Sequence, residues 1–221
     1  MQTLTLQTRV LDEKHSGENL ATLIDDCIEE WNLQGKVFAT VTDNAPNMTI
    51  AVRQSKSQEH VPCFVHTLNL AAKKGLKVLE KDQLLEKIRQ VFRYFHRSNT
   101  AQAILKHKQG LLEMKQKKLK MDVVTRWNST YDMMERYLEQ RQAVVAAIID
   151  PKIKKNNLPI LTEEEVDQLE KVREMLEPFK EATLLMSSEE LPTVSLIMPT
   201  LSTFSNALKL GENDPNCVKE C

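Results

Sequence analysis

Residues that interrupt regular secondary structure are scarce in this chain, whose 221 residues include five glycines and eight prolines. A β-sandwich or β-barrel needs a turn signal roughly every ten residues. The sequence therefore argues against an all-β fold, and the same scarcity excludes collagen-like and low-complexity classes. Since 41% of the residues are hydrophobic and 28% are charged, the chain can build a core. Long helices are the fold that fits best.

The first sixty residues differ from the rest, because they carry the patterns of an α/β unit. Leu4–Leu11 alternates apolar and polar side chains, which predicts a strand. Apolar residues recur at helical spacing over Leu20–Trp31, with Ser16 as the expected N-cap of that helix. Val37–Thr42 has the length and composition of a buried strand. Strand, helix and strand with short connections predict a βαβ unit whose second strand lies parallel to the first.

Helices dominate the remainder of the chain. A helix is expected over residues 45–54 and a third short strand over residues 61–65, after which the only strand-like stretch is 121–125. The helical patterns that follow cover residues 68–79, 83–95, 100–118, 129–149, 162–186 and 194–209. Thr162 and Glu165 have the spacing of a capping box at the start of one of these helices. The sequence thus predicts a small α/β beginning followed by a predominantly α-helical remainder.

The net charge of −1 conceals an uneven distribution of charge along the chain. Residues 73–120 contain fourteen Lys and Arg against four acids, whereas residues 161–221 contain thirteen acids against five bases. Such asymmetry indicates a surface that faces a polyanion, two segments that attract each other, or only solvated helix faces. The densest cationic cluster suits phosphate better than base edges, because a lysine is a point charge. That cluster consists of Lys115, Lys117, Lys118 and Lys120.

Redox and targeting signals favour the inside of a cell. The four cysteines lack the spacing of a disulfide framework, and the first residues lack the basic and apolar regions of a signal peptide. No apolar run approaches the roughly 18 residues of a membrane span. We expect free thiols, no membrane association, and a frayed tail at residues 211–221.

Asp43 is the first candidate for chemistry, because it directly follows an apolar strand. In open α/β sheets, ligands and catalytic groups gather at that end of the strands. A carboxylate there can hold Mg²⁺, but only together with other carboxylates. The alternative is that Asp43 and Asn44 only cap the following helix.

Cys63 and His66 are the second candidate, since their spacing is that of half a zinc site and His60 is a third ligand type nearby. No second pair with zinc-finger spacing follows. The alternative is a buried cysteine and a histidine whose imidazole ties the strand to the helix by a hydrogen bond. We expect no bound zinc and no resident cofactor in this chain.

Arg126 and Trp127 are the third candidate, within Asp122–Tyr131 at a strand-to-helix junction where Ser129 can serve as N-cap. An arginine beside a tryptophan can stack on a base or clamp a phosphate. Alternatively, Trp127 anchors the junction in the core. Other chemistries find no support, because the sequence has no P-loop and no G-x-G-x-x-G, G-x-S-x-G or H-E-x-x-H motif.

Six short segments, taken in their order along the chain, carry a family resemblance. They are His15–Leu20, Trp31, Val41–Met48, Cys63–Leu70, Thr125–Tyr131 and Leu191–Ser195. Together they resemble the middle of a hAT-superfamily transposase, and the likeness is closest to the domesticated zinc finger BED domain-containing proteins of vertebrates. Each segment alone is weak, but their joint order is specific.

The resemblance implies an RNase H-like core interrupted by a large helical insertion domain. It places a partial α/β core at residues 1–66 and the insertion domain at residues 67–210. In active family members, two Asp and one Glu hold two Mg²⁺ ions for DNA strand transfer. Asp43 matches the second Asp, whereas the first Asp would precede Met1 and the Glu would follow Cys221.

The same resemblance assigns the other two candidates. Cys63 and His66 match the C-x-x-H motif of the family, and Arg126 with Trp127 matches an R-W motif that reaches from the insertion domain toward the active site. The BED zinc finger and the oligomerisation region would lie outside these residues. Because one carboxylate cannot hold a two-metal centre, Mg²⁺ is implied only for an intact catalytic parent.

Three functions follow as hypotheses. The first is a catalytically incomplete, domesticated transposase-like protein with a DNA-associated or transcription-related role in the nucleus, whose residues 73–120 bind DNA weakly and without sequence preference. The second is a fragment of an active DDE-type DNA transposase. The third is a helical scaffold that binds protein partners. A rival to the DNA surface is that an acidic helix over residues 163–181 packs against the basic segment and neutralises it.

Overall fold

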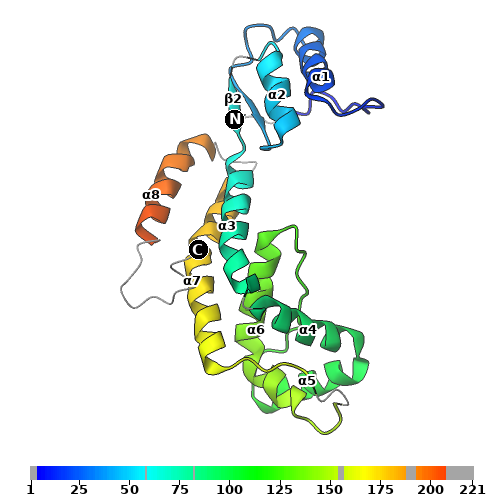
Figure 1. The fold of residues 1–221 in the computed structure, drawn as a ribbon, viewed down its shortest axis with the longest axis vertical. Coiled ribbons are helices and arrows are strands. Elements are labelled where there is room, and N and C mark those ends of the chain that lie inside the picture. The colour runs from blue at the N-terminus through cyan, green and yellow to red at the C-terminus, as the bar shows by residue number, and fades with distance from the viewer. Residues whose placement is uncertain (1–3, 58, 82, 154–156, 188–192, 208–221) are drawn as a thin grey trace. The chain divides into compact units, whose positions relative to one another are not determined.

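The computed structural model describes residues 4–57, 59–81, 83–153, 157–187 and 193–207, and this described part is mostly helical, as predicted. The chain divides into two compact units. Unit 1 consists of residues 1–70 and 183–199, and unit 2 consists of residues 71–182 and 200–221. The elements labelled in Figure 1 are α1 (Gly17–Glu30), β1 (Thr40–Thr42), α2 (Pro46–Gln54), β2 (His60–Pro62), α3 (Phe64–Lys81), α4 (Leu84–Arg97), α5 (Asn99–Leu111), α6 (Trp127–Ile148), α7 (Glu163–Met186), a 3₁₀ turn (Thr193–Leu196) and α8 (Ile197–Ala207).

The predicted helices are present, with shifted ends. Those expected over residues 45–54, 68–79, 83–95, 129–149 and 162–186 correspond to α2, α3, α4, α6 and α7. The helix expected over residues 194–209 is divided, within the described residues, into the 3₁₀ turn and α8. The expected tail at residues 211–221 lies outside the described residues. Among the helices that the structure describes, none combines the length and the apolar character that crossing a bilayer requires.

Unit 1 places α1 against α2, and Figure 1 shows these two helices side by side. The predicted cap of α1 is confirmed, because Ser16 Oγ accepts a hydrogen bond from the backbone N–H of Asn19 at 3.3 Å. The close approach of the two helices requires a glycine at position 17. A Cβ on Gly17 would lie 2.5 Å from Cγ2 of Ile50 on α2.

Two short parallel strands form the sheet of unit 1. β1 pairs with β2 in a register that runs from Thr40 opposite His60 to Thr42 opposite Pro62. The helix α2 connects these two strands. A βαβ unit is therefore present, but it is β1–α2–β2, in which the strand expected over residues 37–42 is the first strand and not the second.

The prediction of a strand over residues 4–11 is wrong, because the structure shows no strand there and Val10 is 85% exposed. The strand expected over residues 37–42 is shorter and less buried than predicted, since Phe38 is 82% and Val41 is 58% exposed. A strand needs a neighbour that satisfies its backbone N–H and C=O groups. Alternation of apolar and polar residues does not supply that neighbour.

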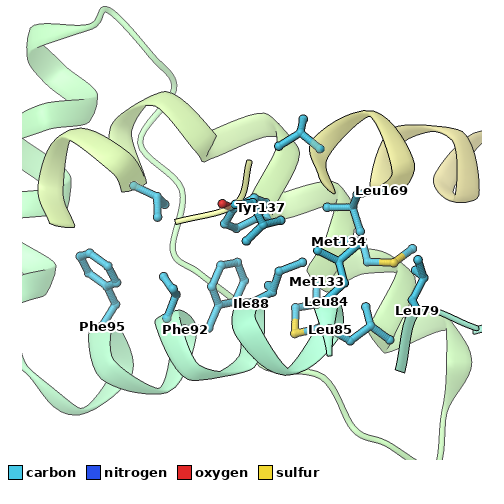
Figure 2. Close-up of a cluster of buried hydrophobic side chains, with 14 of the residues drawn as sticks. Leu79, Leu84, Leu85, Ile88, Phe92, Phe95, Met133, Met134, Tyr137 and Leu169 are labelled. Atoms are coloured by element: carbon cyan, nitrogen blue, oxygen red, sulfur yellow. The ribbon is translucent and has the colours of Figure 1, made fainter. Parts of the chain in front are cut away.

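Unit 2 has a core of fully buried apolar side chains that is centred on α4. Figure 2 shows one face of α4 directed toward side chains of α6 and α7. The residues on this face that are at most 1% exposed are Leu84, Leu85, Ile88, Val91, Phe92 and Phe95. The ring of Tyr137 on α6 lies 6.3 Å from that of Phe92, and burial raises the pKa of Tyr137 to about 12. The apolar repeat at helical spacing thus encodes this packing directly.

The helix expected over residues 100–118 ends early, because α5 covers Asn99–Leu111. Glu113 has a φ of 54°, in the left-handed region that terminates helices. The strand expected over residues 121–125 is also wrong, since this stretch has no regular structure. An irregular segment, residues 112–126, therefore joins α5 to α6.

Of the two helix caps predicted in unit 2, one is confirmed and one is wrong. The backbone N–H of Glu165 donates to Thr162 Oγ1 at 3.2 Å, and the N–H of Thr162 donates to Glu165 Oε2 at 3.0 Å, which completes the capping box of α7. Ser129 does not cap α6, because that helix begins at Trp127. Its hydroxyl instead lies 2.9 Å from the carbonyl oxygen of Val123.

Candidate nucleic-acid interface

Asp43 lies one residue after β1, at the sheet edge where the sequence places it. Its side chain is exposed, and Oδ1 accepts a hydrogen bond from the backbone N–H of Ala45 at 3.2 Å, just before α2. Within the described ranges there is no group of three or more His, Cys, Asp or Glu residues that could hold a metal ion. The described residues therefore do not fit a two-metal Mg²⁺ centre.

Cys63 follows β2 at the same edge of the sheet as Asp43, because the two strands are parallel. Its backbone N–H donates to the carbonyl oxygen of Thr42 at 2.8 Å, and its thiol is half-buried and free. His66 lies one turn further on, in α3. His60 Nε2 lies 2.8 Å from Thr42 Oγ1, a contact that links β2 to β1 and not a strand to a helix. The expectation that Cys63 and His66 bind no zinc stays an untested prediction.

Arg126 and Trp127 lie in different environments although they are adjacent. Arg126 is exposed, and it makes no ion pair with any residue in the described ranges. Trp127 is 2% exposed and belongs to the core of unit 2, with its ring edge-on to that of Tyr131 at 6.2 Å. At this junction the guanidinium of Arg126 is therefore on the surface, and the buried indole of Trp127 holds the adjacent backbone in the core of unit 2.

A buried ion pair fixes the chain just before Arg126. The side chain of Asp122 is 2% exposed and accepts hydrogen bonds from Arg89 on α4, with Nη2 at 2.8 Å and Nε at 3.1 Å. Thr130 Oγ1 donates to the same carboxylate at 3.1 Å. The hydrogen bond to Asp122 is the main cause that raises the pKa of Arg89. Sequence reasoning missed Arg89, because 33 residues separate it from Asp122 and no local pattern links them.

The lysine cluster lies on the irregular segment rather than on a helix, and side chains of α5 and α6 hold its main chain. Gln140 Nε2 donates to the carbonyl of Lys115 at 3.4 Å, Gln109 Nε2 to that of Lys117 at 2.9 Å, and Arg136 Nη1 to that of Lys118 at 2.7 Å. Gln109 also donates to Gln140 Oε1 at 2.7 Å, and both glutamines are buried. The backbone of this segment is therefore fixed although it has no regular structure.

Three of the four clustered lysines present unpaired ammonium groups. Lys115, Lys118 and Lys120 are exposed, and none of them forms an ion pair with a residue that the structure describes. Lys117 is half-buried and pairs with Glu139 of α6. The unpaired positive charge of the cluster therefore comes from three side chains.

Much of the remaining basic segment is neutralised, but mainly by partners other than α7. The ion pairs of this segment include Lys87 with Glu165, Arg89 with Asp122, Arg93 with Glu86, and Lys108 with Asp150. Only the first of these four involves the acidic helix that was proposed as the rival to a DNA surface. That rival therefore accounts for one cation of the segment and for none of the lysine cluster.

Comparisons with known proteins agree on one family. The model of the ZBED1 RNase-like helical domain matches residues 61–175, and that of the ZBED1 RNase-like domain matches residues 1–66. The chain is 27% identical over 209 residues to human zinc finger BED domain-containing protein 4. The matched region covers 93% of this chain and 17% of that protein.

Two further relatives come from a plant and a fungus. The chain is 30% identical over 160 residues to a putative AC transposase of Zea mays, covering 63% of this chain and 20% of that protein. It is 25% identical over 167 residues to a putative transcriptional regulator of Talaromyces stipitatus, covering 57% of this chain and 19% of the relative. The chain thus spans about a fifth of the length of these relatives.

Proposed function

The chain belongs to the hAT-transposase-derived proteins of the zinc finger BED domain-containing type, and we propose that its residues form a catalytically incomplete, domesticated part of such a protein that associates with DNA in the nucleus. Residues 1–66 are then a partial RNase H-like core, and residues 67–210 are the helical insertion domain. Support comes from relatives whose names include a zinc finger BED protein and a putative transcriptional regulator.

Catalytic incompleteness is supported by Asp43, whose exposed carboxylate belongs to no group of three or more His, Cys, Asp or Glu residues within the described ranges. We expect the 221-residue chain to cleave no DNA and to transfer no strands with either Mg²⁺ or Mn²⁺. Metal-dependent cleavage that disappears in Asp43→Ala would contradict this proposal. Such a result would favour an active DDE-type transposase, a candidate that the likeness to the putative AC transposase supports.

DNA association is supported by the three unpaired lysines on a segment whose backbone is held in place. Ammonium groups that neutralise phosphates release condensed counterions, so binding is sequence-independent and weakens as salt rises. The expected dissociation constant at physiological salt is on the order of 10⁻⁴ to 10⁻⁶ M. Arg126 adds a further exposed cation, and Trp127 positions it from the core.

The salt dependence of binding tests the lysine cluster. In Lys115→Gln/Lys118→Gln/Lys120→Gln, the slope of log K against log salt for a DNA duplex should flatten by about 0.9 for each phosphate that the variant no longer neutralises. Lys14→Gln/Lys36→Gln/Arg53→Gln removes the same charge from unit 1 and should leave the slope nearly unchanged. Equal slopes in the two variants, or no binding at low salt, would contradict the proposal and favour a protein-binding scaffold.

A further inference from the structure

A cavity of about 590 Å³ opens within unit 2, between the last turn of α4, the exposed face of α5 and the irregular segment that follows α5. Its volume lies in the range of roughly 300–1,000 Å³ that is typical of ligand pockets. All of its lining residues are described, and none of them belongs to the candidate site around Asp43 or Arg126. Two lining residues, Lys117 and Lys118, also belong to the lysine cluster, but the apolar interior of the cavity is a feature that the proposed function does not use.

The floor of this cavity is apolar. Phe95 is 1% and Leu105 is 5% exposed, and Leu119 contributes from the irregular segment. Three glutamines also line the cavity, and the amide N–H groups of two of them are already engaged. Gln102 Nε2 donates to the carbonyl of His96 at 3.1 Å, and Gln109 Nε2 donates to Lys117 and Gln140. The cavity thus offers apolar contact at its floor, and the amide of Gln116 and the imidazole of exposed His96 are further polar groups in its lining.

The rim of the cavity is positively charged. Lys106, Lys117 and Lys118 line it, whereas no Asp or Glu does. The ammonium group of Lys117 is held by Glu139. Those of Lys106 and Lys118 are exposed and form no ion pair with residues in the described ranges. A ligand that complements this cavity therefore combines an apolar group with negative charge.

The wall that carries Lys117 and Lys118 is formed before any ligand arrives. Gln109 and Arg136 hold the carbonyl groups of these two lysines at 2.9 and 2.7 Å. Gln109 is itself 2% exposed and is braced by Gln140. A wall that is already ordered lowers the entropic cost of binding.

We propose that this cavity docks a short acidic peptide segment of another protein, which inserts one apolar side chain between Lys106 and Lys118. An apolar side chain can pack on the floor without forming hydrogen bonds. Carboxylates on either side of it in the peptide complement the positive charge of Lys106 and Lys118. Nucleic acid fits less well, because stacking on a base needs an exposed ring, and with Phe95 buried the lining offers only the small imidazole of His96. The proposal shares Lys118 with the lysine cluster, but it does not require the cluster to bind DNA.

Fluorescence anisotropy of the 221-residue chain with a labelled peptide tests this proposal. The probe has one central leucine between runs of glutamate, and a second probe carries serine in place of the leucine. Because burial of a leucine side chain drives insertion, the serine probe should bind at least about tenfold more weakly. A third probe, a single-stranded oligonucleotide, shows whether nucleic acid occupies the cavity instead.

Two variants with matched controls locate the binding site. Ala103→Phe fills the cavity without removing a cation, and it should abolish binding of the leucine probe, whereas Thr100→Phe on the same helix, outside the lining, should not. Lys106→Glu should weaken binding at least about tenfold, because it places a negative charge where the acidic peptide binds. This variant tests the same site through a surface side chain, so the proposal can still be judged if Ala103→Phe does not fold. Lys115→Glu, outside the lining, is its control.

The proposal is overturned by any of three results. These are no binding of the leucine probe, equal binding of the leucine and serine probes, or oligonucleotide binding that Ala103→Phe abolishes while the peptide does not bind. Failure of the DNA proposal appears elsewhere, as an unchanged salt slope in the lysine-cluster variant. The two proposals can thus fail separately.

Discussion

The two units of this protein bury their apolar residues to very different extents. In unit 2, α4 contributes six apolar side chains that are at most 1% exposed. In unit 1, the sheet is two short strands, and Phe38 and Val41 beside and within it are 82% and 58% exposed. Both units have clear apolar sequence patterns, so the difference lies in whether a partner element covers the pattern.

This difference indicates where the stability of the chain resides. Apolar burial contributes about 25 cal/mol per Å² removed from water, so the buried face of α4 stabilises unit 2 while exposed side chains contribute little. The protein also has one tryptophan in each unit, Trp31 in unit 1 and Trp127 in unit 2. The stability of unit 2 can therefore be followed by Trp127 fluorescence in a Trp31→Phe background.

The largest expected effect separates two phenylalanines. Phe92→Ala should lower the free energy of unfolding of unit 2 by about 3–5 kcal/mol, because it leaves a cavity against Tyr137. Phe38→Ala removes the same atoms from an 82% exposed site and should change stability by no more than about 0.5 kcal/mol. Urea unfolding measures both, with Trp127 fluorescence for Phe92→Ala and far-UV circular dichroism for Phe38→Ala.

The comparison fails if the two variants lose similar stability. A large loss in Phe38→Ala would mean that this side chain is covered in solution. A small loss in Phe92→Ala would mean that the core of unit 2 collapses around the missing ring.

Most helices and two of the three predicted caps were predictable because their signals are local. Ser16 and the pair Thr162 and Glu165 lie within one turn of the N–H groups that they cap, so spacing alone identifies them. The strand expected over residues 4–11 was not predictable in the same way. A helix satisfies its backbone groups internally, whereas a strand depends on a distant segment that the local pattern does not reveal.

The candidate site shows the same division. Charge density singled out Lys115, Lys118 and Lys120, because charge is visible in the sequence. The hydrogen bonds that hold their segment come from residues that are remote in the chain, and the helix pattern concealed the end of α5. Burial of Trp127 was left open for the same reason, since a tryptophan beside an arginine suits both a core and a surface.

A second prediction compares one glycine from each unit. Gly17→Ala should destabilise unit 1 by about 1–3 kcal/mol, because its Cβ would lie 2.5 Å from Cγ2 of Ile50. Gly110→Ala, near the end of α5, meets only the end of the Gln116 side chain at 3.9 Å and should stabilise unit 2 by up to about 1 kcal/mol. Hydrogen exchange measured by mass spectrometry on α1 and α5 distinguishes the two effects.

Opposite signs in the two glycine variants would show that unit 1 depends on the close packing of α1 on α2. Faster exchange in α1 for Gly17→Ala, with slower exchange in α5 for Gly110→Ala, is the expected pattern. Unchanged exchange in α1 would mean that α2 moves aside without loss of stability.

The smallest effect concerns the capping box, where pH separates two neighbouring glutamates of α7. Burial acts to raise the pKa of Glu165, but the hydrogen bonds from Lys87 and from the N–H of Thr162 outweigh it and hold that pKa below its usual value. A carboxylate with a lowered pKa contributes stability that is present above its unfolded pKa and is lost as pH falls through its folded pKa. Glu165→Gln should therefore cost about 1 kcal/mol near neutral pH, and the difference from the parent chain should shrink below about pH 4.5.

Glu164→Gln is the matched control, because it removes the same charge from the same first turn of α7 while the side chain is exposed. Both variants lose the favourable interaction of a carboxylate with the helix N-terminus, which is worth roughly 0.3–1 kcal/mol. Only Glu165 also bonds Lys87 of α4, so the excess cost of Glu165→Gln measures how firmly α7 is held to the core of unit 2. Urea unfolding of both variants at several pH values, followed through Trp127, gives this excess. If the two variants are equally stable at every pH, the Lys87–Glu165 pair and the reciprocal cap add nothing to unit 2, whose stability then rests on apolar burial alone.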